Sequence, residues 1–157
     1  MIWGKIKKEI YYSDGSLRDI YVLDTNADNW SEWISYINEN YKVRFTYFDS
    51  EGNKILKEKI IFEELLKYWK SFEYSLDAEF VINEIIFKCY FFSEDEIEID
   101  FWPSEVNSLE QHNSIIEYMK SISKLLKKEI ILTPENYNSF DKKYVIVIDD
   151  AVLIPSL

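Results

Sequence analysis

The feature that most constrains the fold is a set of three strand-like segments between residues 74 and 102. Apolar side chains recur at every second position over 74–82 and 97–101, and residues 85–92 are apolar on nearly both faces. A period of two is typical of strands, because successive side chains point to opposite faces of a sheet. The separator Asn83-Glu84 is short enough for a tight turn. These segments predict a three-stranded meander whose middle strand is buried.

The rest of the chain also divides into strand and helix patterns. We expect a first hairpin over 2–12 and 17–23 around Asp14-Gly15, and a second over 42–48 and 54–60. Apolar residues three or four apart predict three helices, beginning after Thr25, near Phe62 and after Ser108. Two final strands, 130–132 and 144–148, flank a loop over 133–140. The predicted class is α+β: an antiparallel-dominated sheet of hairpins and a three-stranded meander, with about three helices packed on one face.

Composition and charge narrow the class of function. The 157 residues show no linker or repeat, so we expect residues 1–157 to form a single α+β domain. Eighteen basic residues against 29 acidic ones leave a net charge of −11. Such a surface repels nucleic acids and anionic membranes, so we expect neither as a partner, whereas a basic protein partner is favoured. A plain solvated acidic surface explains the same charge.

Cysteine content and hydropathy indicate location. A single cysteine, Cys89, excludes an internal disulfide, as is usual in the reducing cytoplasm. No apolar run approaches the 18 residues of a membrane span, and the N-terminal residues lack the plan of a signal peptide. We therefore expect a cytoplasmic protein.

One segment is the candidate partner-binding site. Its acidic cluster and the aromatic residue that follows comprise Glu94, Asp95, Glu96, Glu98, Asp100 and Trp102. Glu96, Glu98 and Asp100 alternate along the predicted strand and therefore project from one face together with Trp102. Three interpretations stay open: a solvated face, a contact surface for a basic partner, and a magnesium or calcium site. A strand spaces such carboxylates roughly 7 Å apart, which disfavours convergent metal ligation.

Aromatic residues support the contact surface. Trp3, Tyr11 and Trp102 fall on the polar phase of their predicted strands, so we expect them to be exposed. Cys89 and His112 lie in phase with apolar neighbours, and we expect both to be structural. The three glycines are too scattered for a phosphate-binding loop. We expect no catalytic residues, no metal and no cofactor.

Three segments carry a family resemblance. The first segment is Gly15-Ser16-Leu17-Arg18-Asp19-Ile20-Tyr21-Val22, which is followed by Trp30. The second segment covers residues 91–100 and continues into Pro103-Ser104-Glu105-Val106. The third segment covers residues 131–136. Together they resemble a group of small, acidic, uncharacterised bacterial proteins, which is similar in size and charge to immunity proteins of bacterial toxin systems.

The resemblance implies a bacterial immunity protein, which neutralises a cognate toxin by binding it. The net charge of −11, the acidic and aromatic segment around Trp102 and the lack of a catalytic motif favour a non-enzymatic, cytoplasmic inhibitor of a basic toxin domain of nuclease type. Two alternatives from other classes stay open. One is a metal-dependent hydrolase that uses the carboxylates of Glu96, Glu98 and Asp100. The other is a small-molecule-binding module with an aromatic pocket. The sequence leaves the oligomeric state open.

Overall fold

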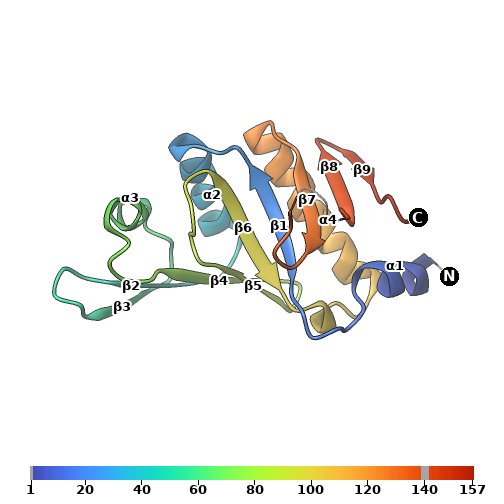
Figure 1. The fold of residues 1–157 in the computed structure, drawn as a ribbon, viewed down its shortest axis with the longest axis horizontal. Helices are drawn as coiled ribbons and strands as arrows, with labels where there is room; N and C mark the ends of the chain where they lie inside the picture. The colour runs from blue at the N-terminus through green and yellow to red at the C-terminus, as the bar shows by residue number, and fades with distance from the viewer. Residues whose placement is uncertain (1, 139–141) are drawn as a thin grey trace.

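The fold is a single antiparallel sheet with helices on one side (Figure 1). The computed structural model describes residues 2–138 and 142–157. Within them lie four α-helices: α1 (Ile2–Ile10), α2 (Ala27–Asn40), α3 (Phe62–Ser71) and α4 (Leu109–Leu126), with a short 3-10 helix, η1 (Pro103–Glu105). The strands within the described part of the chain are β1 (Arg18–Leu23), β2 (Val43–Phe48), β3 (Lys54–Lys57), β4 (Asp77–Ile82), β5 (Ile85–Cys89), β6 (Glu96–Phe101), β7 (Ile130–Pro134), β8 (Val145–Ile148) and β9 (Ala151–Leu153).

The predicted meander is confirmed and lies in the middle of the sheet. The strand order is β3-β2-β4-β5-β6-β1-β7-β8-β9, and every pair is antiparallel. The expectation that the middle strand is buried on both faces is wrong. Phe87 and Cys89 are fully buried, but Ile86 is 40% exposed on the other side of β5. The helices cover one face of the sheet, so β5 buries only the alternate residues that point toward them.

The helices pack on the face that carries the inward side chains of the strands. α4 contacts α2, β7 and β8, and its Tyr118 hydroxyl accepts a hydrogen bond of 2.9 Å from the Trp33 indole of α2. α3 joins the same core through Trp69, whose ring lies 5.2 Å from Trp30 and whose indole donates to the Phe91 carbonyl. The α+β class is therefore confirmed, although the described residues contain one more helix than predicted and the sheet consists of a different set of strands.

The N-terminal segment is a helix, so the prediction of a first hairpin over 2–23 is wrong. Ile2, Ile6 and Ile10 lie four residues apart, a spacing that fits both a strand phase and one side of a helix. α1 buries Ile6 and Ile10 in the common core. Its end is held by Arg18, which donates from Nε to the Ile10 carbonyl (2.8 Å) and from Nη2 to the Tyr12 carbonyl (2.7 Å).

Three smaller differences concern ends and turns. α2 begins at a capping box formed by Asn26 and Asn29. Thr25 does not cap this helix, because its hydroxyl donates a hydrogen bond to the Glu94 carbonyl. A ninth strand, β9, pairs with β8, and sequence analysis missed it. Of the expected loop over 133–140, the first two residues belong to β7, and residues 139 and 140 lie outside the described part. Among the helices that the structure describes, none has the length and apolar character needed to cross a bilayer.

Candidate partner-binding face

The alternation of β6 places its acidic residues opposite the core, as predicted. Ile97, Ile99 and Phe101 are buried on the helix side. Glu96, Glu98 and Asp100 point to the other side of the sheet, and each is half-buried. We call this side of strands β1, β6, β5, β4 and β2 the open face.

The other predicted site residues lie at the two ends of β6. Glu94 and Asp95 are exposed in the turn before the strand, and backbone carbonyls of this turn accept hydrogen bonds from Thr25 and Trp30 at the start of α2. Trp102 follows the strand and is 48% exposed, which confirms the prediction for that residue.

The prediction of exposure fails for the other two aromatic residues. Tyr11 is only 2% exposed and Trp3 is partly buried, because the strand phase does not apply to a segment that forms a helix. The Tyr11 hydroxyl lies 2.6 Å from His112 Nδ1. Burial lowers the pKa of His112 to about 4. The imidazole is therefore neutral at pH 7, and both residues belong to the core.

Strand register arranges charges in a row across the open face. Directly paired residues follow one another in the order Arg44 (β2), Glu79 (β4), Lys88 (β5), Asp100 (β6) and Asp19 (β1). Signs alternate along the first four positions, and Lys88 Nζ lies 3.5 Å from Glu79 Oε1. At the end of the row two carboxylates, Asp100 and Asp19, are direct neighbours. Like charges directly opposite each other are unfavourable. Asp100 has Lys88 on its other side, whereas the neighbours of Asp19 in register are Asp100 and Thr133, so Asp19 is the position without a basic partner.

Asp19 is the most buried member of this row, and sequence analysis did not name it as a site residue. It is 2% exposed, and its Oδ2 accepts hydrogen bonds from the Asn136 backbone N–H (2.9 Å) and the Tyr21 hydroxyl (3.2 Å). The Tyr21 hydroxyl also lies 2.9 Å from Glu98 Oε1, and its one proton can serve only one of the two carboxylates. The loop after β7 therefore covers the β1 end of the open face.

Burial and mutual repulsion perturb these carboxyl groups. Burial raises the pKa of Asp19 to about 7, and repulsion from Glu98 and Asp100 adds to this increase. The hydrogen bond from the Asn136 N–H lowers the pKa, but by less than the other effects raise it. Burial and the charge of Glu98 raise the pKa of Asp100 to about 6. Burial also raises the pKa of Glu96 and of Glu98. A cation brought to this face would favour the ionised form of all four groups.

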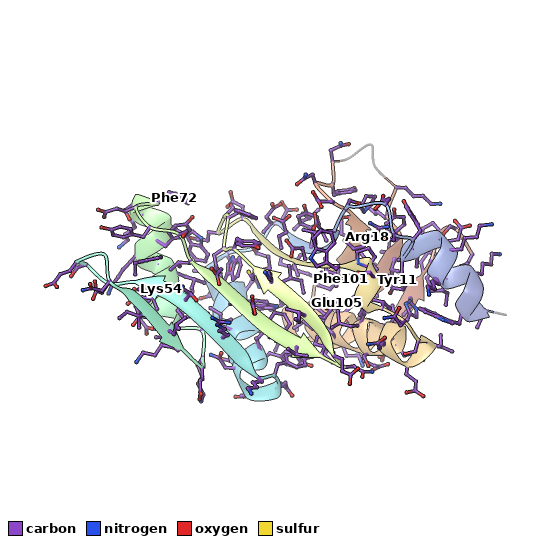
Figure 2. All side chains as sticks on the ribbon, turned by 90° about the horizontal axis from the view of Figure 1, so that it is seen from below. Tyr11, Arg18, Lys54, Phe72, Phe101 and Glu105 are labelled. Carbon is purple, nitrogen blue, oxygen red and sulfur yellow. The ribbon has the colours of Figure 1, made fainter. Side chains whose placement is uncertain are left out.

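Several hollows open on the surface of the described residues, and two of them bear on the candidate site. One, of about 340 Å³, opens beside Trp102, and its lining includes Tyr90, the carboxylates of Asp100 and Glu105, and the basic side chain of Lys88. The other, of about 460 Å³, lies between α3 and the β2–β3 hairpin and is also aromatic and acidic, with Tyr47, Tyr68, Tyr74, Glu64 and Glu73 in its lining. Figure 2 shows Phe101 and Glu105, which line the first hollow, well apart from Phe72, the C-cap of α3.

The described residues of this face give no support to the metal-dependent alternative. Within residues 2–138 and 142–157, no three or more His, Cys, Asp or Glu side chains come together in an arrangement that could hold a metal ion. Cys89 is fully buried, and burial raises the pKa of its thiol. A neutral, enclosed thiol is not an activated nucleophile.

The fold and the face together define an α+β protein with one helix-covered side and one acidic side. No protein-family model matches the sequence, and no curated protein sequence matches it significantly. Among solved structures, the fold is similar to a chain in the crystal structure of the toxic C-terminal tip of CdiA from Pseudomonas aeruginosa in complex with its immune protein. The TM-score is 0.53 at 12% identity, and the match covers 90% of this chain and 99% of that one.

Proposed function

We propose that this chain is a cytoplasmic bacterial immunity protein, which neutralises a cognate toxin domain by binding it through the open face. The observation that carries the proposal is the charge row that ends in two adjacent carboxylates, Asp100 and Asp19, beside the exposed Trp102. The similarity of fold to a chain of a toxin–immunity complex supports the same class of function.

The physical mechanism is occlusion of a basic surface. A toxin domain of nuclease type holds the phosphates of its substrate with lysine and arginine side chains. The same side chains can form charge-assisted hydrogen bonds with Glu96, Glu98 and Asp100, and the toxin is then unable to hold its substrate. The net charge of −11 accelerates the encounter, because opposite fields steer the two proteins together.

The partner is tested first in cells. We would express the toxin domain encoded by the reading frame next to this gene, with and without this protein, and follow growth. Growth rescue together with a purified 1:1 complex is the expected outcome. Growth arrest that this protein leaves unchanged, together with no measurable binding, would exclude the proposed function.

The open face is tested by charge reversal on β6. We expect Glu98→Lys with Asp100→Lys to weaken toxin binding by about 2–5 kcal/mol, because both carboxylates are half-buried and would face basic groups of the toxin. The association rate and its dependence on salt should also fall. The measurement is binding kinetics at two salt concentrations, with a thermal melt to confirm folding.

A second double variant controls for net charge. Glu63→Lys with Glu73→Lys changes the charge by the same amount at exposed positions in and just after α3. These positions lie away from the open face, so this variant should bind nearly as tightly as the wild type. Equal effects of the two double variants would mean that only overall charge matters, and β6 would then not form the interface.

A further inference from the structure

The hollow beside Trp102 combines aromatic and acidic groups with one basic side chain, Lys88, whose ammonium lies 3.5 Å from a Glu79 carboxylate oxygen. Trp102 and Tyr90 supply aromatic surface, and Asp100 and Glu105 supply carboxylates. Glu105 Oε1 accepts the Ile86 backbone N–H at 2.8 Å, which ties η1 to β5 and holds this side of the hollow in place. The lining therefore comes from elements that are hydrogen-bonded to one another.

Asp100 is the carboxylate that is available to a ligand. Among the described residues it forms no hydrogen bond and no salt bridge. Its neighbour Lys88 is paired in register, but the Lys88 ammonium lies 3.5 Å from Glu79 on the opposite strand. On the other side stands Asp19, a second carboxylate. A half-buried carboxylate with a like charge beside it is stabilised by any cation that can reach it.

The chemistry of the lining favours a guanidinium group. A guanidinium is planar, stacks on aromatic rings, and donates two parallel hydrogen bonds to one carboxylate. An ammonium group lacks this planar fork and is more strongly hydrated. We propose that the hollow receives one arginine side chain of the toxin domain, which contacts Trp102 and Tyr90 and pairs with Asp100. The identity of this partner rests on the proposed function, whereas the arginine pocket itself can be tested alone.

The direct test uses a small probe. We would titrate the ¹⁵N-labelled full-length protein with N-acetyl-arginine amide and with N-acetyl-citrulline amide, which has the same shape without the charge. The Trp102 indole signal, assigned from Trp102→Phe, should shift saturably with a Kd on the order of 1 mM for arginine. Citrulline should give no saturable shift.

Two variants locate the binding. Asp100→Asn should weaken arginine binding about 10-fold or more, because the charge-assisted pair is lost. Glu73→Gln removes a carboxylate from the second, larger hollow and should leave the Kd unchanged. Shifts that centre on Tyr68 and Tyr74 of that second hollow, or equal binding by Asp100→Asn, would overturn the assignment.

Binding of the toxin domain separates the two proposals. If the wild type binds the toxin domain and Asp100→Asn binds it at least 10-fold more weakly, both proposals are supported. If the two proteins bind it equally, the arginine pocket is overturned and the proposed function stands. If the wild type does not bind it at all, the proposed function is overturned, and with it the toxin as the source of the arginine.

Discussion

Asp19 is the residue at which the fold makes a negative charge most costly. It lies under the loop after β7, and its nearest charged neighbours, Glu98 and Asp100, are also acidic. The Asn136 N–H compensates only part of this cost, so the pKa rises to about 7 from an ordinary value of 3.8. Near pH 7 this carboxyl group is therefore partly protonated, and a basic partner on the open face would favour its ionised form.

This elevated pKa predicts how stability depends on pH. A carboxyl group whose pKa is raised by folding contributes stability that is complete below its unfolded pKa and is lost as pH rises through its folded pKa. We expect the free energy of unfolding of the wild type to fall between pH 6.5 and 8.5. Asp19→Asn should show a smaller fall, because asparagine keeps an oxygen for the Asn136 N–H without the charge. Urea unfolding at the two pH values measures the difference.

The comparison with Asp19→Asn separates the effect of Asp19 from that of His112. Burial lowers the pKa of this imidazole from 6.5 to about 4, so its contribution to stability is complete above pH 6.5 and is lost as pH falls toward 4. The remaining change in this contribution between pH 6.5 and 8.5 is the same in the wild type and in Asp19→Asn, so it cancels in their difference. The exposed Glu73→Gln serves as a control and should follow the wild type. If Asp19→Asn lost as much stability as the wild type, Asp19 would not be the titrating group.

At the scale of elements, α1 shows how local pattern and tertiary packing can disagree. Its Ile6 and Ile10 enter the core, and Tyr11 after its end contacts both Phe101 and His112. A strand in this position would need a pairing partner, whereas β1 is already paired on both sides by β6 and β7. A helix satisfies its own backbone hydrogen bonds, so it can occupy the end of the sheet without one.

Glycine substitution distinguishes a helix from a strand in this segment. Gly4 lies inside α1, and the space around its missing side chain is empty. Gly4→Ala should therefore raise the free energy of unfolding by about 0.5–1 kcal/mol, because alanine is the better helix former. Gly4→Val should be less stable than Gly4→Ala, since a β-branched side chain is restricted in a helix. Guanidinium unfolding of the purified variants provides the comparison.

Gly15 is the matched control for this prediction. The space around it is equally empty, but its φ of +81° lies in the left-handed region that side chains disfavour. Gly15→Ala should lower stability, in contrast to Gly4→Ala. A stability order with valine above alanine at position 4 would point to extended backbone there and would contradict the helix.

At the scale of the whole molecule, one hydrophobic cluster connects the elements. It includes Ile6 of α1, Trp30 of α2, Phe87 of β5, Met119 of α4 and Val147 of β8. These residues come from both ends of the chain and from its middle. Since a domain is defined by its own core, we propose that residues 1–157 form a single domain.

A single domain predicts one cooperative unfolding transition. Helix content by far-ultraviolet circular dichroism and tryptophan fluorescence should give the same midpoint in denaturant, because the buried tryptophans and α4 belong to the same cluster. Calorimetric and van't Hoff enthalpies should agree as well. Two separated midpoints would show that the chain contains more than one independently folding unit.

The sequence by itself determined the features that depend on local periodicity. The period of two over 96–101 assigns Glu96, Glu98 and Asp100 to one side of β6, and the spacing of apolar residues locates α2, α3 and α4. These predictions hold because side-chain direction follows from backbone geometry within a few residues. The same rule fails for α1, where a spacing of four residues fits two geometries, and for β9, which is only three residues long.

Only the tertiary structure decided which residues complete the candidate site. Asp19 meets Asp100 because β1 inserts between β6 and β7, and no local pattern encodes a pairing between residues so distant in sequence. Burial of Asp19 and Tyr21 depends in turn on the loop that returns over β1. Pairing and burial arise from the free energy of the whole core, so the charge row and its unpaired end could be found only in the folded molecule.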